Sequence, residues 1–146
     1  MIRCSTGYVV EQMTRFAELF NDAMFRIYTG PPPATSDRAP TGTYLGYITR
    51  DGLLPGAGHG LSFDVAPNGY VQKPPTENWQ LIGKASGIAG YGRLSAYNDA
   101  PEDSPSAYRI DFEVNPDDGN GILIASPNII NGLVRDQPGF YFTILR

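Results

Sequence analysis

Three consecutive prolines, Pro31, Pro32 and Pro33, constrain the fold of this 146-residue chain more than any other feature. Proline has no backbone N–H to give to a sheet ladder, and a run of prolines favours a stiff, extended polyproline II path. Residues 25–29 before them alternate apolar and polar side chains as a half-buried strand does, and residues 43–49 after them are predicted to form a second strand. The sequence therefore predicts two strands joined by a stiff connection that lies outside any sheet ladder.

Residues 7–24 carry the one convincing helical pattern of the chain. Thr6 is the expected N-cap of this helix, because a threonine side chain can accept a hydrogen bond from the first turn. The stripe covers either the chain's own core or a partner protein, and ordinary amphipathic helices favour the first. Its apolar members recur at spacings of three and four residues and are Val9, Val10, Met13, Phe16, Ala17, Phe20 and Met24.

Short strands separated by turns follow the prolines through the rest of the chain. Asn68-Gly69 is a strong hairpin signal, and it joins residues 61–65 to residues 70–73. Further strands are expected at 79–85, 91–97, 108–114, 122–125 and 140–145, whereas 129–134 is either a strand or an irregular connection. This spacing predicts an all-β fold, a jelly-roll-like antiparallel sandwich over 25–146 preceded by the helix, in a single domain spanning 1–146.

Charge and composition argue against several classes of partner. The net charge is −4 and the 11 basic residues are scattered, whereas a nucleic-acid-binding surface needs clustered lysine and arginine. No stretch approaches the ~20 apolar residues of a membrane span. We therefore expect neither nucleic acid nor a membrane as partner. The N-terminus lacks the pattern of a secretory signal, and the lone Cys4 fits folding in a reducing cytoplasm.

No catalytic or metal-binding constellation is evident, so the chain is predicted not to be an enzyme and to need no cofactor. The one histidine, His59, lies between glycines in Gly-Ala-Gly-His-Gly and is expected to be an exposed loop residue. Asp111 and Glu113 share one face of a predicted strand and could serve glycoside hydrolysis, but a solvated outer face explains them more simply. Asp117-Asp-Gly-Asn-Gly121 lacks the bidentate glutamate of a calcium loop and is expected to be a turn.

Three blocks of the sequence resemble a family of small structural proteins of tailed-bacteriophage virions. The family pattern L-R-I-Y-S-G, followed by Q-P-x-S-A-D-A-A-x-T-G-T-x-L, is similar to Phe25–Leu45. The pattern W-x-G-x-A-x-G-T-A-G-W-x-R-L is similar to Trp79–Leu94, with Tyr91 in place of the second tryptophan. The pattern R-x-D-G-x-V is similar to Arg109–Val114, with Phe112 in place of glycine. The resemblance weakens over 122–134, where the family carries a polar strand.

The resemblance implies a virion component, and for that class a β-sandwich capsid decoration (cement) protein that binds the major capsid protein and its own copies as a trimer. Tyr28, Pro31, Pro32 and Pro33 are the predicted partner-binding residues, because a stiff arm loses little conformational entropy on binding. The same prolines could instead be a plain connection. A tail, collar or fibre-attachment component, in contact with a receptor or carbohydrate, is the alternative, and a glycan-acting enzyme using Asp111 or Glu113 is the third class considered.

Overall fold

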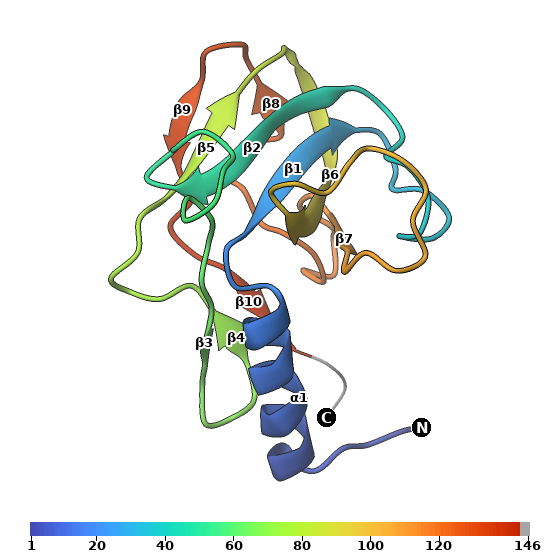
Figure 1. Cartoon of the computed structure of the whole chain (residues 1–146), viewed down its shortest axis with the longest axis vertical. Coiled ribbons are helices and arrows are strands. Elements are labelled where there is room, and N and C mark those ends of the chain that lie inside the picture. Colours follow the sequence, from blue (N-terminus) through green and yellow to red (C-terminus); the bar gives the residue numbers. More distant parts are fainter. Residues whose placement is uncertain (144–146) are drawn as a thin grey trace.

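A computed structural model describes residues 1–143 of the chain as one helix and ten short strands (Figure 1). The helix, α1, spans Thr6–Leu19 and precedes every strand. The strands are β1 (Ala23–Thr29), β2 (Tyr44–Arg50), β3 (Asp64–Val65), β4 (Val71–Gln72), β5 (Trp79–Gly83), β6 (Gly87–Ala96), β7 (Ile110–Glu113), β8 (Asn128–Ile129), β9 (Val134–Asp136) and β10 (Tyr141–Phe142).

The strands form two sheets, in which every pairing between named strands is antiparallel. The larger sheet has the order β7-β6-β1-β2-β5-β9, and β8 pairs with the start of β6. The smaller sheet has the order β10-β4-β3 and lies beside α1, below the larger sheet in Figure 1. An antiparallel sandwich-like fold with one N-terminal helix is therefore correct, whereas the strand order does not establish the two four-stranded sheets of a jelly roll.

Aromatic side chains from both sheets and the helix fill the space between them. Phe25 of β1 packs edge-to-face on Phe112 of β7, with ring centroids 5.8 Å apart. Phe63 makes the same kind of contact with Trp79 of β5 at 5.6 Å and with Phe16 of α1 at 5.3 Å. Edge-to-face geometry suits the quadrupoles of the rings and adds to the hydrophobic gain of burying them. The helix is thus one wall of the chain's own core.

The helix is shorter than predicted and begins one residue earlier. Ser5, not Thr6, is the N-cap, and its Oγ accepts a hydrogen bond from the Tyr8 N–H at 3.3 Å. The helix ends at Leu19 because Asp22 adopts a left-handed conformation, with φ at 68°, and turns the chain into β1. Met24 therefore lies in a strand. The buried stripe is Val9, Met13 and Phe16, which answers the question of whether the stripe faces the core.

Several predicted strands are confirmed and others are corrected. The hairpin at Asn68-Gly69 joins β3 to β4, and Gly69 has the positive φ, 89°, that such a turn requires. Residues 122–125 form no strand; Ile122 makes only an isolated parallel bridge to Val114. Residues 129–134 are divided between β8, a turn and β9. The last predicted strand is β10 over Tyr141–Phe142, and its end at 144–145 lies outside the described residues.

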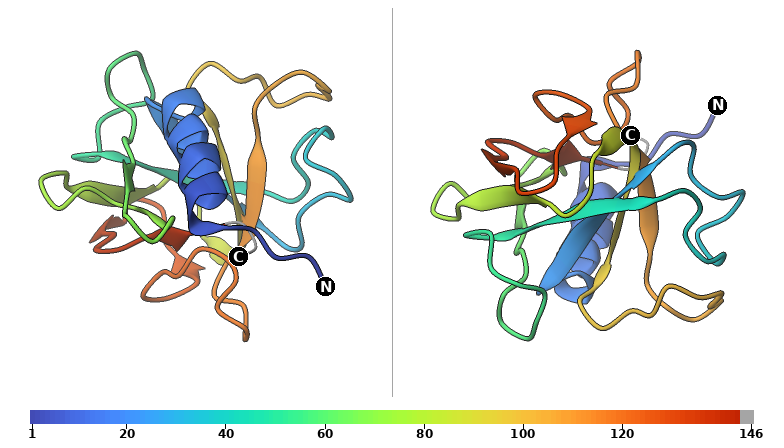
Figure 2. Two further views of the ribbon diagram at one scale, coloured as in Figure 1. Left: turned by 90° about the horizontal axis from the view of Figure 1, so that it is seen from below. Right: turned by 90° about the horizontal axis from the view of Figure 1, so that it is seen from above.

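Two long connections project from the same side of the molecule in both views of Figure 2. Residues 30–43, which include the three prolines, join β1 to β2, and residues 97–109 join β6 to β7. The two connections touch, because the backbone N–H of Ser104 donates to the carbonyl of Asp37 at 2.7 Å. β1 and β6 are antiparallel neighbours, so the two connections leave opposite ends of the sheet and meet over one of its faces.

Candidate functional site

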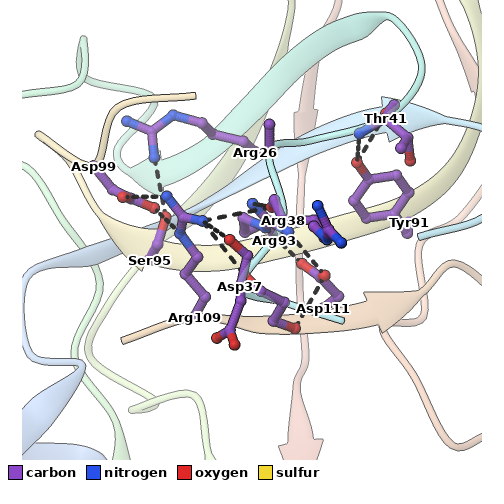
Figure 3. Close-up of polar contacts among 12 residues, drawn as sticks. Arg26, Asp37, Arg38, Thr41, Tyr91, Arg93, Ser95, Asp99, Arg109 and Asp111 are labelled. Atoms are coloured by element: carbon purple, nitrogen blue, oxygen red, sulfur yellow. Dashed lines mark hydrogen bonds and ion pairs between the residues drawn. The ribbon is translucent and has the colours of Figure 1, made fainter. Parts of the chain in front are cut away.

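An ion pair between neighbouring strands forms the base of the candidate site (Figure 3). Arg93 of β6 and Asp111 of β7 are register partners. The Arg93 guanidinium donates to both carboxylate oxygens of Asp111, at 2.7 and 3.0 Å, and the two side chains are only 2% and 7% exposed. A bidentate, buried pair of this kind is strongly directional, and removing either partner leaves a buried charge unpaired.

The same ion pair holds the connection of residues 30–43 against the outer face of the sheet. Arg93 also donates from Nη1 to the carbonyl of Arg38 at 2.8 Å, and the Ser36 hydroxyl donates to Asp111 at 3.0 Å. The connection thereby covers a face that was predicted to be solvated. The prediction for Asp111 is wrong for this reason, whereas Glu113, two residues further along β7, is exposed as expected.

A second ion pair holds the connection of residues 97–109. Arg109 donates to the two carboxylate oxygens of Asp99 at 2.8 Å each, and its Nη2 also donates to the carbonyl of Glu102 at 2.9 Å. Burial alone would raise the pKa of Asp99. The hydrogen bonds and charge of Arg109 outweigh burial, with help from Ser95 and Arg26, and hold the pKa below its usual value. Asp99 is therefore a permanent anion at neutral pH.

Tyrosines complete the support of residues 30–43. The Tyr91 hydroxyl donates to the carbonyl of Thr41 at 2.8 Å and accepts from the Thr41 N–H at 2.9 Å. The Tyr28 ring stacks on Tyr91, with centroids 5.3 Å apart and planes at 17°, and also contacts Tyr44 at 5.7 Å. The prolines begin three residues after Tyr28 in the sequence. Pro31 is exposed, and its carbonyl accepts a hydrogen bond from the Thr41 hydroxyl at 3.0 Å.

A cleft of about 360 Å³ opens between the two connections and the outer face of β1, β2 and β6, and we call it the Arg26 cleft. Proline and alanine side chains contribute apolar walls, and the ion pairs described above lie beneath it. Its lining residues are Arg26, Tyr28, Pro40, Tyr44, Arg93, Ser95, Asp99, Ala100 and Pro101.

The predicted partner-binding residues only partly coincide with this cleft. Tyr28 lines it but is nearly buried, at 6% exposure, so it can present little beyond its edge and hydroxyl. Pro31, Pro32 and Pro33 lie outside the lining, and the last two are half-buried. Sequence reasoning missed Arg26, Tyr44 and Asp99. The alternation in β1 places Arg26 opposite the buried Phe25 and Ile27, and that was the one signal available for it.

The structure places the remaining residues that the sequence singled out in separate surroundings. His59 is half-buried rather than exposed, with Nδ1 2.7 Å from the carbonyl oxygen of Leu54. Asp111 and Glu113 do not share an environment, since one is held by Arg93 and the other is exposed. Within residues 1–143, no group of three or more histidine, cysteine, aspartate and glutamate side chains is placed to hold a metal ion. Over the same residues no helix is long and apolar enough to cross a membrane.

Comparison with known proteins found no family model, no curated protein and no solved structure that matches this chain. We therefore infer a function from the two ion-paired connections, residues 30–43 and 97–109, from the cleft between them and from the motifs in the sequence.

Proposed function

We propose that this chain is a structural protein of a tailed-bacteriophage virion, a capsid decoration or cement protein that binds the major capsid protein and stabilises the head. The main support is that residues from the three sequence blocks that resemble the phage family lie close together in the structure. Arg93 belongs to the second block and Asp111 to the third, and these two residues form the central ion pair. Arg26 and Tyr28, from the first block, line the cleft beside them. The polar residues of three separated motifs thus converge on one surface.

The rigidity of that surface also suits a binding role. Long connections normally lose conformational entropy when they bind, at a cost of about 0.5–1.5 kcal/mol for each immobilised side chain. Here two ion pairs and a direct contact between the connections fix residues 30–43 and 97–109 in the free protein. Such preorganisation favours a protein whose work is adhesion to another surface.

Finer features of the proposal rest on the resemblance alone. These are a jelly-roll relationship for the sandwich, assembly as a homotrimer, and location in the virion after synthesis in the host cytoplasm. Contact with other virion proteins also rests on the resemblance, whereas the scattered basic residues and the net charge of −4 argue against nucleic acid or an anionic membrane as partner.

A tail, collar or fibre-attachment protein that contacts a receptor or carbohydrate is the second candidate. The Arg26 cleft favours it, because Tyr44 is 37% exposed there and offers a ring face to a ligand. An enzyme is not favoured by the same cleft. A catalytic general acid needs a raised pKa, and the pKa of Asp99, the one carboxylate in the lining, is lowered.

Copy number per particle distinguishes these candidates. Quantitative mass spectrometry of purified virions would measure the ratio of this chain to the major capsid protein. Hundreds of copies, or one trimer for each local three-fold axis, are expected for a decoration protein. Six or twelve copies would move the chain to the tail or collar, and absence from purified virions would overturn both assignments.

A further inference from the structure

Arg26 is the one cation of the cleft without a carboxylate partner in residues 1–143. Arg93 is paired with Asp111 and Arg109 with Asp99, but no carboxylate lies within ion-pair distance of Arg26. Its guanidinium donates only to neutral oxygens, those of Ser95, Ala96 and Tyr97. Figure 3 shows the bond from Arg26 to Ser95 and the Asp99 carboxylate turned to Arg109.

The charge of Arg26 is therefore left over in a region that is otherwise neutralised. Asp99 lies near enough to feel Arg26, but both of its oxygens accept from Arg109. The N–H groups of Arg26 at Nε, and one at Nη2, have no hydrogen-bond partner among the described residues. An uncompensated guanidinium beside apolar walls is a strong point of attraction for an anion, because the local dielectric constant is lower than that of water.

Two phenol groups stand beside this guanidinium. Tyr28 and Tyr44 both line the cleft, their rings touch, and no residue in 1–143 accepts from or donates to either hydroxyl. The Tyr28 hydroxyl is not sealed from solvent, since the described residues contain no buried polar side-chain atom without a partner, and Tyr44 is itself 37% exposed. Burial raises the pKa of Tyr44 to about 12 and raises that of Tyr28 as well, against the opposing charge of Arg26. Both groups stay protonated at neutral pH and remain hydrogen-bond donors.

We propose that the Arg26 cleft is a carboxylate-binding site that receives an acidic side chain of the partner protein. Arg26 supplies the charge, and the hydroxyls of Tyr28 and Tyr44 donate hydrogen bonds. Pro40 and Pro101 in the walls contact the aliphatic stem of the incoming side chain. A carboxylate is preferred to a neutral group because it would form the direct ion pair that Arg26 lacks among the described residues. This inference rests on the proposed function for the nature of the partner, a protein of the virion.

The test uses a small probe in place of the unidentified partner. The full-length, isotopically labelled chain is titrated by NMR with N-acetyl-glutamate methylamide and, in parallel, with the matched glutamine compound. The glutamate compound is expected to shift the Arg26 Nε–H signal and the ring signals of Tyr28 and Tyr44, saturating at millimolar concentration, on the order of a single charge-assisted contact. The glutamine compound is expected to leave these signals unchanged. Equal shifts with both compounds, or shifts at other residues only, would overturn the proposal.

Variants separate the role of Arg26 from a general effect of charge. Arg26→Gln is expected to weaken glutamate binding at least about tenfold, since it removes the charge-assisted contact. Tyr44→Phe keeps the ring and removes one hydrogen-bond donor, and it is expected to weaken glutamate binding several-fold. It provides a second test of the site in case Arg26→Gln does not fold. Arg15→Gln removes an exposed helix arginine, paired with Glu18, and is expected to change nothing. Undiminished binding in the folded Arg26→Gln variant, or in Tyr44→Phe, would count against the site.

Glucuronate forms a further arm of the titration. Binding of glucuronate at Arg26 without binding of the glutamate compound would overturn the proposal in favour of an acidic glycan.

Measuring how the variants bind to phage particles separates a failure of the carboxylate site from a failure of the proposed function. If Arg26→Gln still decorates virions as the unmodified chain does, the carboxylate site fails while the virion assignment stands. If the unmodified chain binds glutamate but is absent from virions, the virion assignment fails while the carboxylate site stands.

Discussion

Arg93 and Asp111 stand opposite each other on adjacent strands and form the bidentate ion pair on which residues 30–43 are anchored. Both side chains are nearly removed from solvent, although they lie on the face of the sheet that points away from the aromatic core. The pair converts what would be a solvated sheet face into the support of the candidate binding surface.

Breaking this pair is expected to destabilise the fold strongly. Asp111→Asn leaves the Arg93 guanidinium buried without its counter-charge, at a cost of about 3–5 kcal/mol in the free energy of unfolding. Urea denaturation followed by tryptophan fluorescence, which reports on the buried Trp79, measures the loss. Glu18→Gln is the matched control, because it breaks an exposed pair with Arg15 and should cost no more than about 0.5 kcal/mol. Similar losses in the two variants would contradict a structural role for the buried pair.

The lowered pKa of Asp99 predicts an acid-sensitive contribution to stability. In the range between its folded pKa and the unfolded value of about 3.9, the unfolded chain binds more protons at this residue than the folded chain does. The contribution is thus fully present above the unfolded pKa and is lost as the pH falls through the folded pKa. Asp99→Asn should be less stable than the unmodified chain at pH 6, and the difference should shrink below about pH 4. Urea midpoints measured from pH 6 to pH 2.5 test this, and a difference that does not change with pH would contradict it.

Gly42 is expected to be irreplaceable for a steric reason. Its φ is +77°, and a Cβ added there would lie 2.1 Å from the carbonyl oxygen of Thr29. Gly58 has nearly the same φ, +78°, but a Cβ there would meet nothing within 4 Å. Gly58→Ala should therefore cost only the left-handed backbone penalty of about 1–2 kcal/mol, and Gly42→Ala should cost clearly more. Thermal melts measure the loss of stability in each variant. Equal losses would contradict the steric prediction, because they would mean that the backbone around Gly42 can shift to accept a Cβ without further loss of stability.

The three prolines are expected to matter for assembly more than for folding. They lie outside every sheet ladder, so replacing Pro31–Pro33 with Gly-Ser-Gly should leave the free protein folded. Loss of their stiffness should weaken attachment to particles by about 1–3 kcal/mol, at the usual 0.4–1 kcal/mol for each proline. The melting temperature of the free variant and its occupancy on virions would be measured together. Unchanged occupancy with an unchanged melt would mean that the prolines are only a spacer.

Local patterns predicted the parts of the fold whose partners lie close in sequence. The stripe of Val9, Met13 and Phe16 repeats at helical spacing and was recognisable, and so was the Asn68-Gly69 hairpin, because each depends on a few neighbouring residues. The end of the helix was misplaced. Phe20 and Met24 continue its spacing, but the turn at Asp22 is fixed by hydrogen bonds from the distant backbone of Gly58 and Gly60 to its carboxylate.

The candidate site was less predictable because it depends on contacts between distant residues. Arg26 reaches Ser95, 69 positions away, only because β1 and β6 are neighbours in this register. Asp111 alternates correctly onto the outer face of β7, but no local pattern shows that Ser36 and Arg38 will cover it. The sequence-based prediction identified Tyr28, which lines the cleft, but not Arg26, which supplies the positive charge of the cleft.

Electron cryo-microscopy of virions that carry this chain would show whether residues 30–43 and 97–109 form the surface by which it attaches to a phage capsid. We expect density for this fold on the outer shell, repeated over the capsid lattice. We also expect residues 30–43 and 97–109 to face the major capsid protein and a carboxylate of that protein to lie in the Arg26 cleft. Density confined to the tail or collar, or capsid-bound density with both connections facing solvent, would contradict this expectation.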